Sequence, residues 1–242
     1  LCLRLGSAPL PRRGELRAWP SPNFGERRGG LRPSLVVLHY TAMASCAEAR
    51  ARLCDPAAEV SAHWLIAETG ASEALVPEAA RAWHAGAGEW AGQGDVNSRS
   101  IGIELANRGD HPFPEPQMAA LEALLSAVMA RWSIRPEGVI AHSDMAPGRK
   151  QDPGPHFDWR RLARAGLSVW PSSAAPDRPA AGFADHARAF GYPGDSDEAV
   201  LRAFRLRFRP WMAGTADVAD ATDAGLVADL ARRFGIDATR PN

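Results

Sequence analysis

The sequence lacks net charge, because Lys and Arg total 28 and Asp and Glu also total 28 in 242 residues. A balanced chain has no overall field that would draw it onto nucleic acid or an anionic membrane. The arginines between Arg202 and Arg209 do not fall on one stripe of a helix, which also argues against nucleic-acid binding. Lysine is nearly absent, and Lys150 is the single example.

Cysteine is scarce, with only Cys2, Cys46 and Cys54 in the chain. The count is odd and no CxxC spacing occurs, which argues against a disulfide framework and a cysteine zinc site. Residues 45–54 have helical spacing, so Cys46 and Cys54 are expected more than two turns apart. That separation is about 12 Å at 1.5 Å per residue, which is beyond the reach of a disulfide. We therefore expect free thiols.

Long apolar runs are also missing. No stretch reaches the roughly 18 apolar residues of a transmembrane helix. Residues 1–17 are broken by prolines and arginines and lack the apolar centre of a signal peptide. A cytoplasmic location is therefore expected. We also expect a monomer. Because the sequence begins with Leu, the alternative is the periplasm or cell envelope, reached through an upstream signal that has been removed.

Strand and helix patterns alternate along the first two thirds of the chain, which predicts an α/β (α+β) fold. The alternation of Ile101, Ile103 and Leu105 with polar or small residues predicts a half-buried strand over 100–105. Apolar residues at three- and four-residue steps predict a long helix over 116–132. The other predicted strands cover 34–40, 62–67, 73–76 and 138–141, and the other helices cover 45–54 and 159–165, with loops over 86–98 and 143–157.

The composition divides the chain into two parts. Residues 171–180 (PSSAAPDRPA) have the composition of a linker. Beyond it, three short helical patterns over 183–190, 197–208 and 222–234 predict a small three-helix domain. Such a domain is marginal on its own and is expected to pack on the first. The predicted division is an N-terminal extension over 1–20, a main domain over 21–170, the linker over 171–180 and the helical domain over 181–242.

Two of the seven histidines stand at the ends of apolar strands. His39 ends VVLHY, and His142 follows GVIA. Asp152 comes ten residues after His142, in a loop rich in Pro and Gly. Two imidazoles and one carboxylate are a standard set of catalytic zinc ligands, which leaves a fourth position for water. On spacing alone, a metal site and unrelated residues are about equally good interpretations.

Two neighbouring charges favour the metal site. Lys150 lies two residues before Asp152, where a cation could stabilise the oxyanion of a tetrahedral intermediate. Glu104 lies in the strand SIGIEL, where a carboxylate could take a proton from water and pass it to a leaving amine. The alternatives are a solvated surface lysine and an outward-facing strand glutamate.

Five segments in a fixed order resemble the zinc-dependent N-acetylmuramoyl-L-alanine amidases of the AmpD and AmiD type. This family (amidase type 2) is related to the peptidoglycan recognition proteins. The segments are HYT (39–41), SAHWLI (61–66), RAWHAG (81–86), NSRSIGIELAN (97–107) and AHSDMAPGRKQDPG (141–154). The resemblance covers roughly residues 20–170. It implies a central mixed sheet flanked by helices, with one zinc ion per chain in a groove above the sheet.

The resemblance also implies roles for individual residues. It places the zinc ligands at His39, His142 and Asp152, the base at Glu104 and the oxyanion stabiliser at Lys150. An aspartate as third ligand, and Ala62 rather than tyrosine before His63, place the chain with the AmpD-like branch. The residues expected in the substrate groove are Tyr40, His63, Trp83, His84, Asn97 and Asn107. For His63 a buried structural role stays open.

The function implied is hydrolysis of the amide between N-acetylmuramic acid, or its anhydro form, and L-alanine in peptidoglycan or muropeptides. A non-catalytic peptidoglycan-recognition module is the alternative. The complete set of ligands and auxiliary charges counts against that alternative. The C-terminal helices are similar to a small peptidoglycan-binding domain, although they could serve only to stabilise the first domain. Neither intact sacculus nor anhydro-muropeptide is favoured as substrate.

Overall fold

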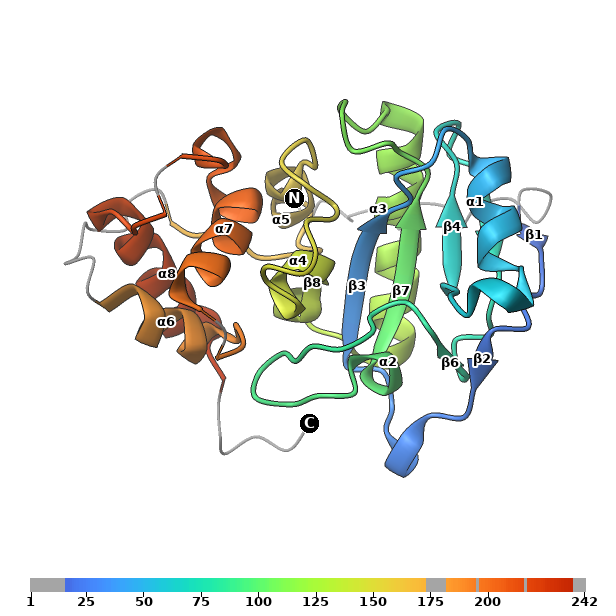
Figure 1. The fold of residues 1–242 in the computed structure, drawn as a ribbon, viewed down its shortest axis with the longest axis horizontal. Helices are drawn as coiled ribbons and strands as arrows, with labels where there is room; N and C mark the ends of the chain where they lie inside the picture. The colour runs from blue at the N-terminus through green and yellow to red at the C-terminus, as the bar shows by residue number, and fades with distance from the viewer. Residues whose placement is uncertain (1–15, 173–181, 195, 216, 237–242) are drawn as a thin grey trace, which may run out of the picture.

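The computed structural model describes residues 16–172, 182–194, 196–215 and 217–236. Their centre is a six-stranded mixed sheet with the strand order β1-β5-β4-β7-β3-β8 (Figure 1). β4 and β5 are antiparallel, and the other neighbours are parallel. The strands are β1 (Leu16–Ala18), β3 (Leu35–Tyr40), β4 (Trp64–Ile66), β5 (Ser72–Ala74), β7 (Ser100–Leu105) and β8 (Val139–Ala141). The central mixed sheet implied by the resemblance is confirmed.

Helices flank this sheet, and a two-stranded antiparallel ribbon of β2 (Phe24–Gly25) and β6 (Arg81–Ala82) lies beside it. The helices are α1 (Cys46–Leu53), α2 (Val96–Arg99), α3 (Glu115–Trp132), α4 (His142–Met145), α5 (Trp159–Arg164), α6 (Phe183–Phe190), α7 (Asp197–Phe208) and α8 (Ala221–Phe234). Short 3-10 turns occupy Arg28–Gly30, Pro56–Ala58, Pro136–Gly138 and Pro210–Met212. Within the described ranges, no helix has the length and hydropathy that a membrane span requires.

The predicted elements are present, with bounds shifted by at most two residues. Two single-turn helices, α2 and α4, lie partly where we expected loops. A single turn of four residues leaves no apolar periodicity in the sequence, so pattern analysis has nothing to detect. Of the predicted linker, residues 173–180 lie outside the described residues. Residues 16–18, in the predicted N-terminal extension, form an edge strand of the sheet.

The prediction that strand 100–105 is half-buried is wrong. β7 is central in the sheet, between β4 and β3, and only Glu104 in it is partly exposed. The polar face is covered because Gly102 leaves room for the ring of His84. A Cβ atom on Gly102 would lie 2.4 Å from that ring.

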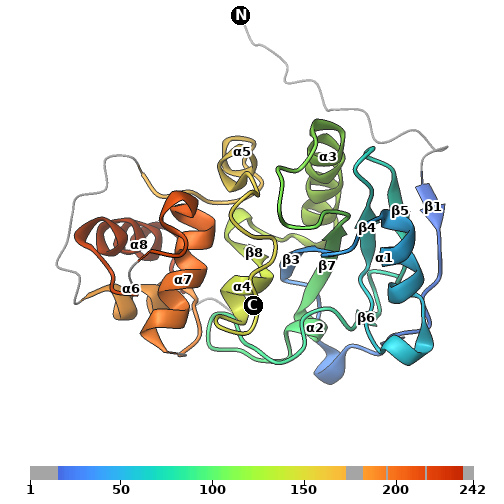
Figure 2. The ribbon, with the colours of Figure 1, turned by 45° about the horizontal axis from the view of Figure 1, so that its top comes forward.

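The two faces of the sheet are covered differently. One face packs against α3 through Leu38, Ile103, Leu121 and neighbouring residues. On the other face, α1 covers Leu65 of β4, whereas α4 and the C-terminal helices cover Val37 of β3. Figure 2 shows α3 and α1 on opposite sides of the sheet. His39 and Glu104 lie on the second face, because alternate residues of a strand point the same way.

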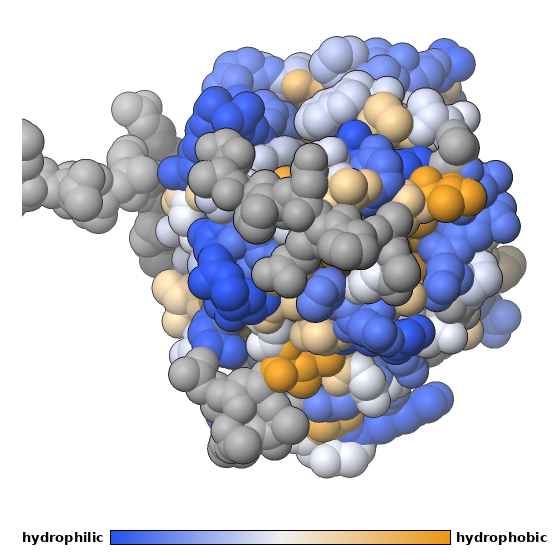
Figure 3. All heavy atoms as spheres, turned by 90° about the vertical axis from the view of Figure 1, so that its left-hand side faces the viewer, coloured by the Kyte–Doolittle hydropathy of each residue, from blue (hydrophilic) through white to orange (hydrophobic). Residues whose placement is uncertain are grey.

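The three C-terminal helices share one apolar core with the sheet. Phe190, Phe204 and Phe208 are buried in the same cluster as Val37 and Ile140. The outer surface of this unit is mainly hydrophilic with scattered apolar patches (Figure 3). Its apolar side chains therefore face the first domain, as expected for a helical unit too small to hold a core of its own.

Candidate metal centre and active site

The sheet brings the two strand-end histidines together. Leu38 of β3 is paired with Ala141 of β8, so the next residues, His39 and His142, leave neighbouring parallel strands at the same edge. Glu104 of β7 is paired with His39 on its other side. The loop after α4 returns Asp152 to this point, where its carbonyl oxygen accepts the backbone N–H of Ser143 at 3.1 Å.

Three ligand atoms of different residues meet at one point. His39 Nδ1 lies 2.9 Å from His142 Nδ1, and each of these nitrogens lies 2.9 Å from Asp152 Oδ2. All three side chains are buried, with residue exposures of 1%, 3% and 8%. The predicted ligands are therefore assembled as a compact group that could hold a metal ion.

The tautomer of the His142 ring is set by the hydrogen bond that its Nε2 makes, away from the three candidate ligand atoms. His142 Nε2 lies 2.9 Å from the carbonyl oxygen of Ala85. A carbonyl oxygen only accepts, so Nε2 must be the donor. In the neutral ring Nδ1 then carries a lone pair, and it points to the meeting point of the three ligands.

A chain of three hydrogen bonds determines which ring nitrogen of His39 carries the hydrogen. Ser100 Oγ donates to the carbonyl oxygen of Val96 at 2.6 Å and so accepts from His84 Nε2 at 3.1 Å. His84 Nδ1 is then an acceptor, and it takes the hydrogen of His39 Nε2 at 3.1 Å. In the neutral ring, His39 Nδ1 is therefore left with a lone pair.

The donor set fits a divalent cation. Burial first, and then the charge of His142, lower the pKa of His39 to about 4 and keep its ring neutral. Two lone pairs and a carboxylate cannot satisfy one another. Zinc bonds of about 2.0–2.2 Å place tetrahedral ligands roughly 3.3–3.6 Å apart, so the atoms, now 2.9 Å apart, would need to separate by only a few tenths of an ångström.

Glu104 is set beside this group without a partner. Its side chain is partly exposed, but Oε2 is buried and has no hydrogen bond within the described residues. Burial, followed by the charge of Asp152, raises the pKa of Glu104 to about 8, while Lys150 acts in the opposite direction. A carboxylate with a raised pKa and a free oxygen is suited to accept and return a proton.

Lys150 is half-buried in the loop that carries Asp152. Its backbone N–H donates to Ala146 at 3.0 Å. The preceding Arg149 holds the loop by donating to the carbonyl oxygen of Ala85 at 2.7 Å. The charge of Lys150 acts on both His39 and Glu104, which places it within electrostatic range of the site.

Among the residues predicted to contact substrate, His63 and Asn97 are buried, and their polar atoms are hydrogen-bonded within the protein. His63 accepts the N–H of Gly102 at 2.9 Å and donates to the carbonyl oxygen of Ala80 at 3.1 Å. Asn97 Oδ1 accepts the backbone N–H groups of His84 and Ala85 at 3.0 and 2.8 Å. These contacts support the structural alternative for His63 and indicate a positioning role for Asn97.

The other predicted groove residues differ in exposure. Asn107 is buried, and its Oδ1 accepts the N–H of Gly109 at 2.7 Å. Tyr40 and Trp83 are partly exposed and stay candidates for substrate contact. His84 is half-buried, and its hydrogen bond to His39 indicates an orienting role that the motif alone did not suggest.

Sequence analysis missed the groups that support the ligands. Ala85 acts through a carbonyl oxygen that any residue has, and Ser100 was treated only as the start of a strand. Asp144 and Arg207 form a buried ion pair behind His142 although they are 63 positions apart. No local pattern could have indicated these contacts.

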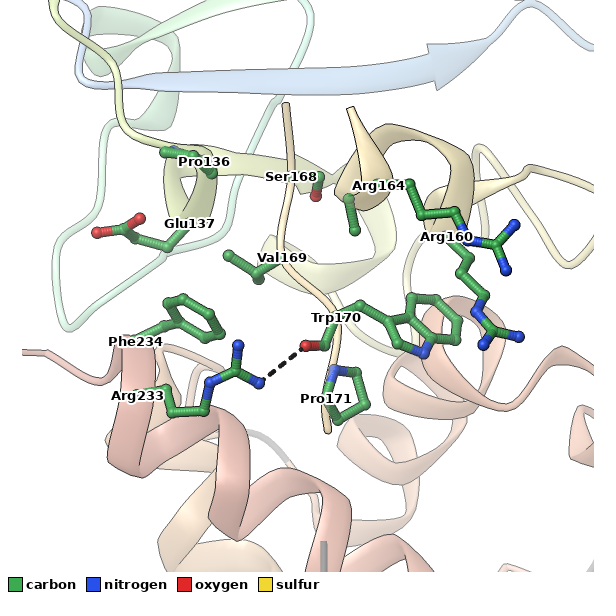
Figure 4. Close-up of a pocket in the computed structure, with 11 residues that line it drawn as sticks. Pro136, Glu137, Arg160, Arg164, Ser168, Val169, Trp170, Pro171, Arg233 and Phe234 are labelled. Carbon is green, nitrogen blue, oxygen red and sulfur yellow. Dashed lines mark hydrogen bonds between the residues drawn. The ribbon is translucent and has the colours of Figure 1, made fainter. Parts of the chain in front are cut away.

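A separate cleft of about 440 Å³ lies between α5, the 3-10 turn before β8 and the end of α8. In Figure 4, Arg233 donates to the carbonyl oxygen of Trp170, and Arg160 and Arg164 extend beside the Trp170 indole. None of the predicted site residues lines this cleft.

Comparison with known proteins identifies the family. The model of the N-acetylmuramoyl-L-alanine amidase family (Amidase_2) matches residues 29–155, a span that holds all five sequence segments described above. N-acetylmuramoyl-L-alanine amidase AmiD of Escherichia coli is 35% identical over 239 residues, covering 85% of each chain. The chain belongs to the N-acetylmuramoyl-L-alanine amidase family. The resemblance stated from the sequence is confirmed.

Other members are similar over different lengths. The 1,6-anhydro-N-acetylmuramyl-L-alanine amidase AmpD of Citrobacter freundii is 34% identical over 61% of this chain and 88% of its own. The structure of Escherichia coli AmiD, in complex with anhydro-N-acetylmuramic acid-L-Ala-D-gamma-Glu-L-Lys, has a TM-score of 0.77 and 32% identity. It covers 89% of this amidase-family chain and 99% of its own. The likeness to AmiD therefore includes the C-terminal helices.

Proposed function

We propose that this protein hydrolyses the amide between N-acetylmuramic or anhydro-N-acetylmuramic acid and L-alanine, and that the reaction depends on zinc. The observation that carries the proposal is the convergence of His39 Nδ1, His142 Nδ1 and Asp152 Oδ2, each 2.9 Å from the other two. Imidazole nitrogens and a carboxylate oxygen suit zinc.

The chemistry divides between the metal and two side chains. Zinc, when bound, acts as a Lewis acid toward a carbonyl oxygen and lowers the pKa of water. Glu104 takes the proton of the attacking water and delivers it to the amine of L-alanine as the amide bond breaks. Lys150 donates to the oxyanion that develops on the lactyl carbonyl. Burial and the charge of Asp152 raise the pKa of Glu104, which favours holding the proton until the amine takes it.

The substrate class is proposed from the relatives. The AmiD structure holds an anhydro-muramyl tripeptide, and AmpDh3 of Pseudomonas aeruginosa has been solved with anhydromuramic pentapeptide. The latter is 27% identical to this chain, with a TM-score of 0.76. A small soluble muropeptide is therefore the first substrate to test.

A recognition module that binds without cutting is the alternative. Such a module needs neither a complete ligand triad nor an unpartnered carboxylate with a raised pKa. The presence of both in this chain favours catalysis over binding alone.

The test uses anhydro-N-acetylmuramyl-L-Ala-D-γ-Glu-L-Lys and compares metal-free with zinc-reloaded protein. Mass spectrometry should detect free anhydro-N-acetylmuramic acid and the intact tripeptide only after zinc is added. Binding without either product would support the recognition module. Equal hydrolysis before and after chelation would reject the zinc dependence while leaving the amidase activity in place.

We also propose that peptidoglycan binds at the cleft of Figure 4, which α5, the segment that follows it and the end of α8 line together. Trp170 offers an aromatic face, and Arg160 and Arg164 have no ion pair within the described residues, so carboxylates of the polymer could reach them. An Arg160→Glu/Arg164→Glu variant should bind sacculi more weakly and hydrolyse the small muropeptide normally. The control reverses two other exposed arginines, Arg28 and Arg188. Equal sacculus binding by both variants would reject this location.

A further inference from the structure

The single helical turn that carries His142 depends on contacts with other parts of the protein for its position. α4 consists of four residues, His142–Met145, and an isolated single turn is unstable because helix nucleation is unfavourable. Asp144 in this turn is fully buried, and its Oδ2 accepts the backbone N–H of Ala141 at 2.9 Å. This bond fixes the Ile140–Ala141 peptide, one residue before the candidate ligand, so the position of the Asp144 carboxylate influences where the backbone places His142.

The carboxylate of Asp144 is itself held by the C-terminal helices. Arg207 of α7 donates to Oδ2 at 2.5 Å, and Tyr192, between α6 and α7, donates to Oδ1 at 2.8 Å. Asp144 therefore links two parts of the protein. It accepts a hydrogen bond from the end of the strand that precedes His142, and it also accepts hydrogen bonds from the C-terminal helical unit.

Arg207 is anchored more firmly than an ion pair requires. It is 1% exposed and also donates to the carbonyl oxygen of Val139 and to Ser168 Oγ, both at 3.1 Å. Its guanidinium lies over the ring of Trp159, 4.3 Å from the centroid. The contact with Val139 ties the same side chain to β8, the strand that directly precedes His142.

Burying two charges is costly, and apolar residues of similar volume often stabilise a protein equally well. An apolar pair would lack the directional bonds to Ala141 and Val139. Rigid support of a ligand is what a metal site requires from the residues around it.

We propose that Arg207 of the C-terminal unit is a positioning residue for the metal ligand His142, acting through Asp144 and the Ala141 peptide. The inference rests on the metal site of the proposed function. It gives the C-terminal helices a part in the metal centre that does not depend on peptidoglycan binding.

The test measures zinc affinity by competition with a chelator, using Arg207→Lys and Arg207→Met. Lysine keeps the charge but loses the planar fork that reaches three acceptors at once. Both variants should bind zinc about 10- to 100-fold more weakly, the range found for residues that support a ligand. The visible spectrum of the cobalt-substituted protein should also change, because that spectrum reports ligand geometry.

The matched control is Arg205→Met. Arg205 is a second buried arginine of α7, 2.6 Å from Asp223 of α8, so its ion pair lies inside the helical unit. Its loss should lower the free energy of unfolding without changing zinc affinity. Tyr192→Phe is the mild variant in case Arg207 variants do not fold, since it removes one hydroxyl and should weaken zinc binding severalfold.

Unchanged zinc affinity in folded Arg207→Lys, or in Tyr192→Phe if the arginine variants are unfolded, would overturn the inference. Equal loss of affinity in Arg205→Met would also overturn it, because the effect would then be general destabilisation. Wild-type protein that binds no zinc would instead reject the zinc dependence of the proposed function.

Discussion

His142 donates its Nε2 hydrogen to the carbonyl oxygen of Ala85 at 2.9 Å, and the N–H of Ala85 is held by Asn97 at 2.8 Å. The candidate ligand is therefore oriented by the carbonyl group of a residue whose own N–H is fixed by a buried side-chain amide. The bond leaves His142 Nδ1 free to face His39. The site thus consists of three ligand side chains and of the backbone that determines their tautomers.

We expect one zinc ion per chain, and its loss in His142→Ala. The substitution removes one of three ligands and leaves the other two with no replacement nitrogen. Metal analysis after gel filtration should give about one zinc in the wild type and nearly none in the variant. Zinc retained at wild-type stoichiometry would reject His142 as a ligand.

His84→Gln tests the relay that leaves the Nδ1 lone pair on His39. Glutamine fills part of the same space but does not reproduce the ring contact with both His39 and Ser100. We expect zinc affinity to fall about 10- to 100-fold. His111→Gln is the control, because its side chain is 43% exposed. If the two variants bind zinc equally well, His84 does not support the ligand.

Sequence reasoning anticipated that His39, His142 and Asp152 come together, because they follow from strand ends and a motif, and both are local features. It could not separate His63 and Asn97, which are buried supports, from Tyr40 and Trp83, which are partly exposed. Membership of a motif shows that a residue is near the site but not which way it faces. The pair of Arg207 with Asp144 was also beyond prediction, because the packing of two units creates it.

The stability of the protein should fall in mild acid because His63 is buried in its neutral form. Burial lowers the pKa of His63 to about 3, whereas the ring titrates near 6.5 in the unfolded chain. The unfolded state therefore binds the extra proton below pH 6.5, and stability is lost as the pH falls from there toward 3. Between pH 7 and pH 5 this histidine alone should cost about 2 kcal/mol.

His63→Gln isolates that contribution. The variant should be less stable than the wild type at pH 7, and the difference should shrink at pH 5 because the variant has no ring to protonate. Urea unfolding of metal-free protein at the two pH values measures both free energies. A difference that stays constant with pH would show that His63 does not carry this dependence.

The thiols should be free. Cys46 and Cys54 stand at opposite ends of α1, and both are unpaired. Cys2 lies outside the described residues, and its free state stays a prediction from the sequence. Titration of denatured, unreduced protein should find three reactive thiols per chain. A single reactive thiol would show that a disulfide forms.

The last prediction separates metal binding from catalysis. Glu104→Ala and Lys150→Ala should keep zinc, because neither residue belongs to the ligand triad. Loss of an oxyanion donor typically lowers turnover about 10²- to 10³-fold, and loss of a general base lowers it about 10²- to 10⁴-fold. Release of tripeptide from the muropeptide, followed at saturating zinc, should fall within these ranges.

Lys150→Arg is the sharper variant. It keeps the positive charge that acts on Glu104 and His39, but it replaces a compact ammonium with a broad planar group. If charge alone mattered, turnover would be preserved. A positioned donor predicts a clear loss of turnover with zinc content unchanged. Turnover at the wild-type rate in Lys150→Arg would therefore remove the oxyanion role. If Glu104→Ala also kept the wild-type rate, the proposed proton transfer would be wrong even with the metal site intact.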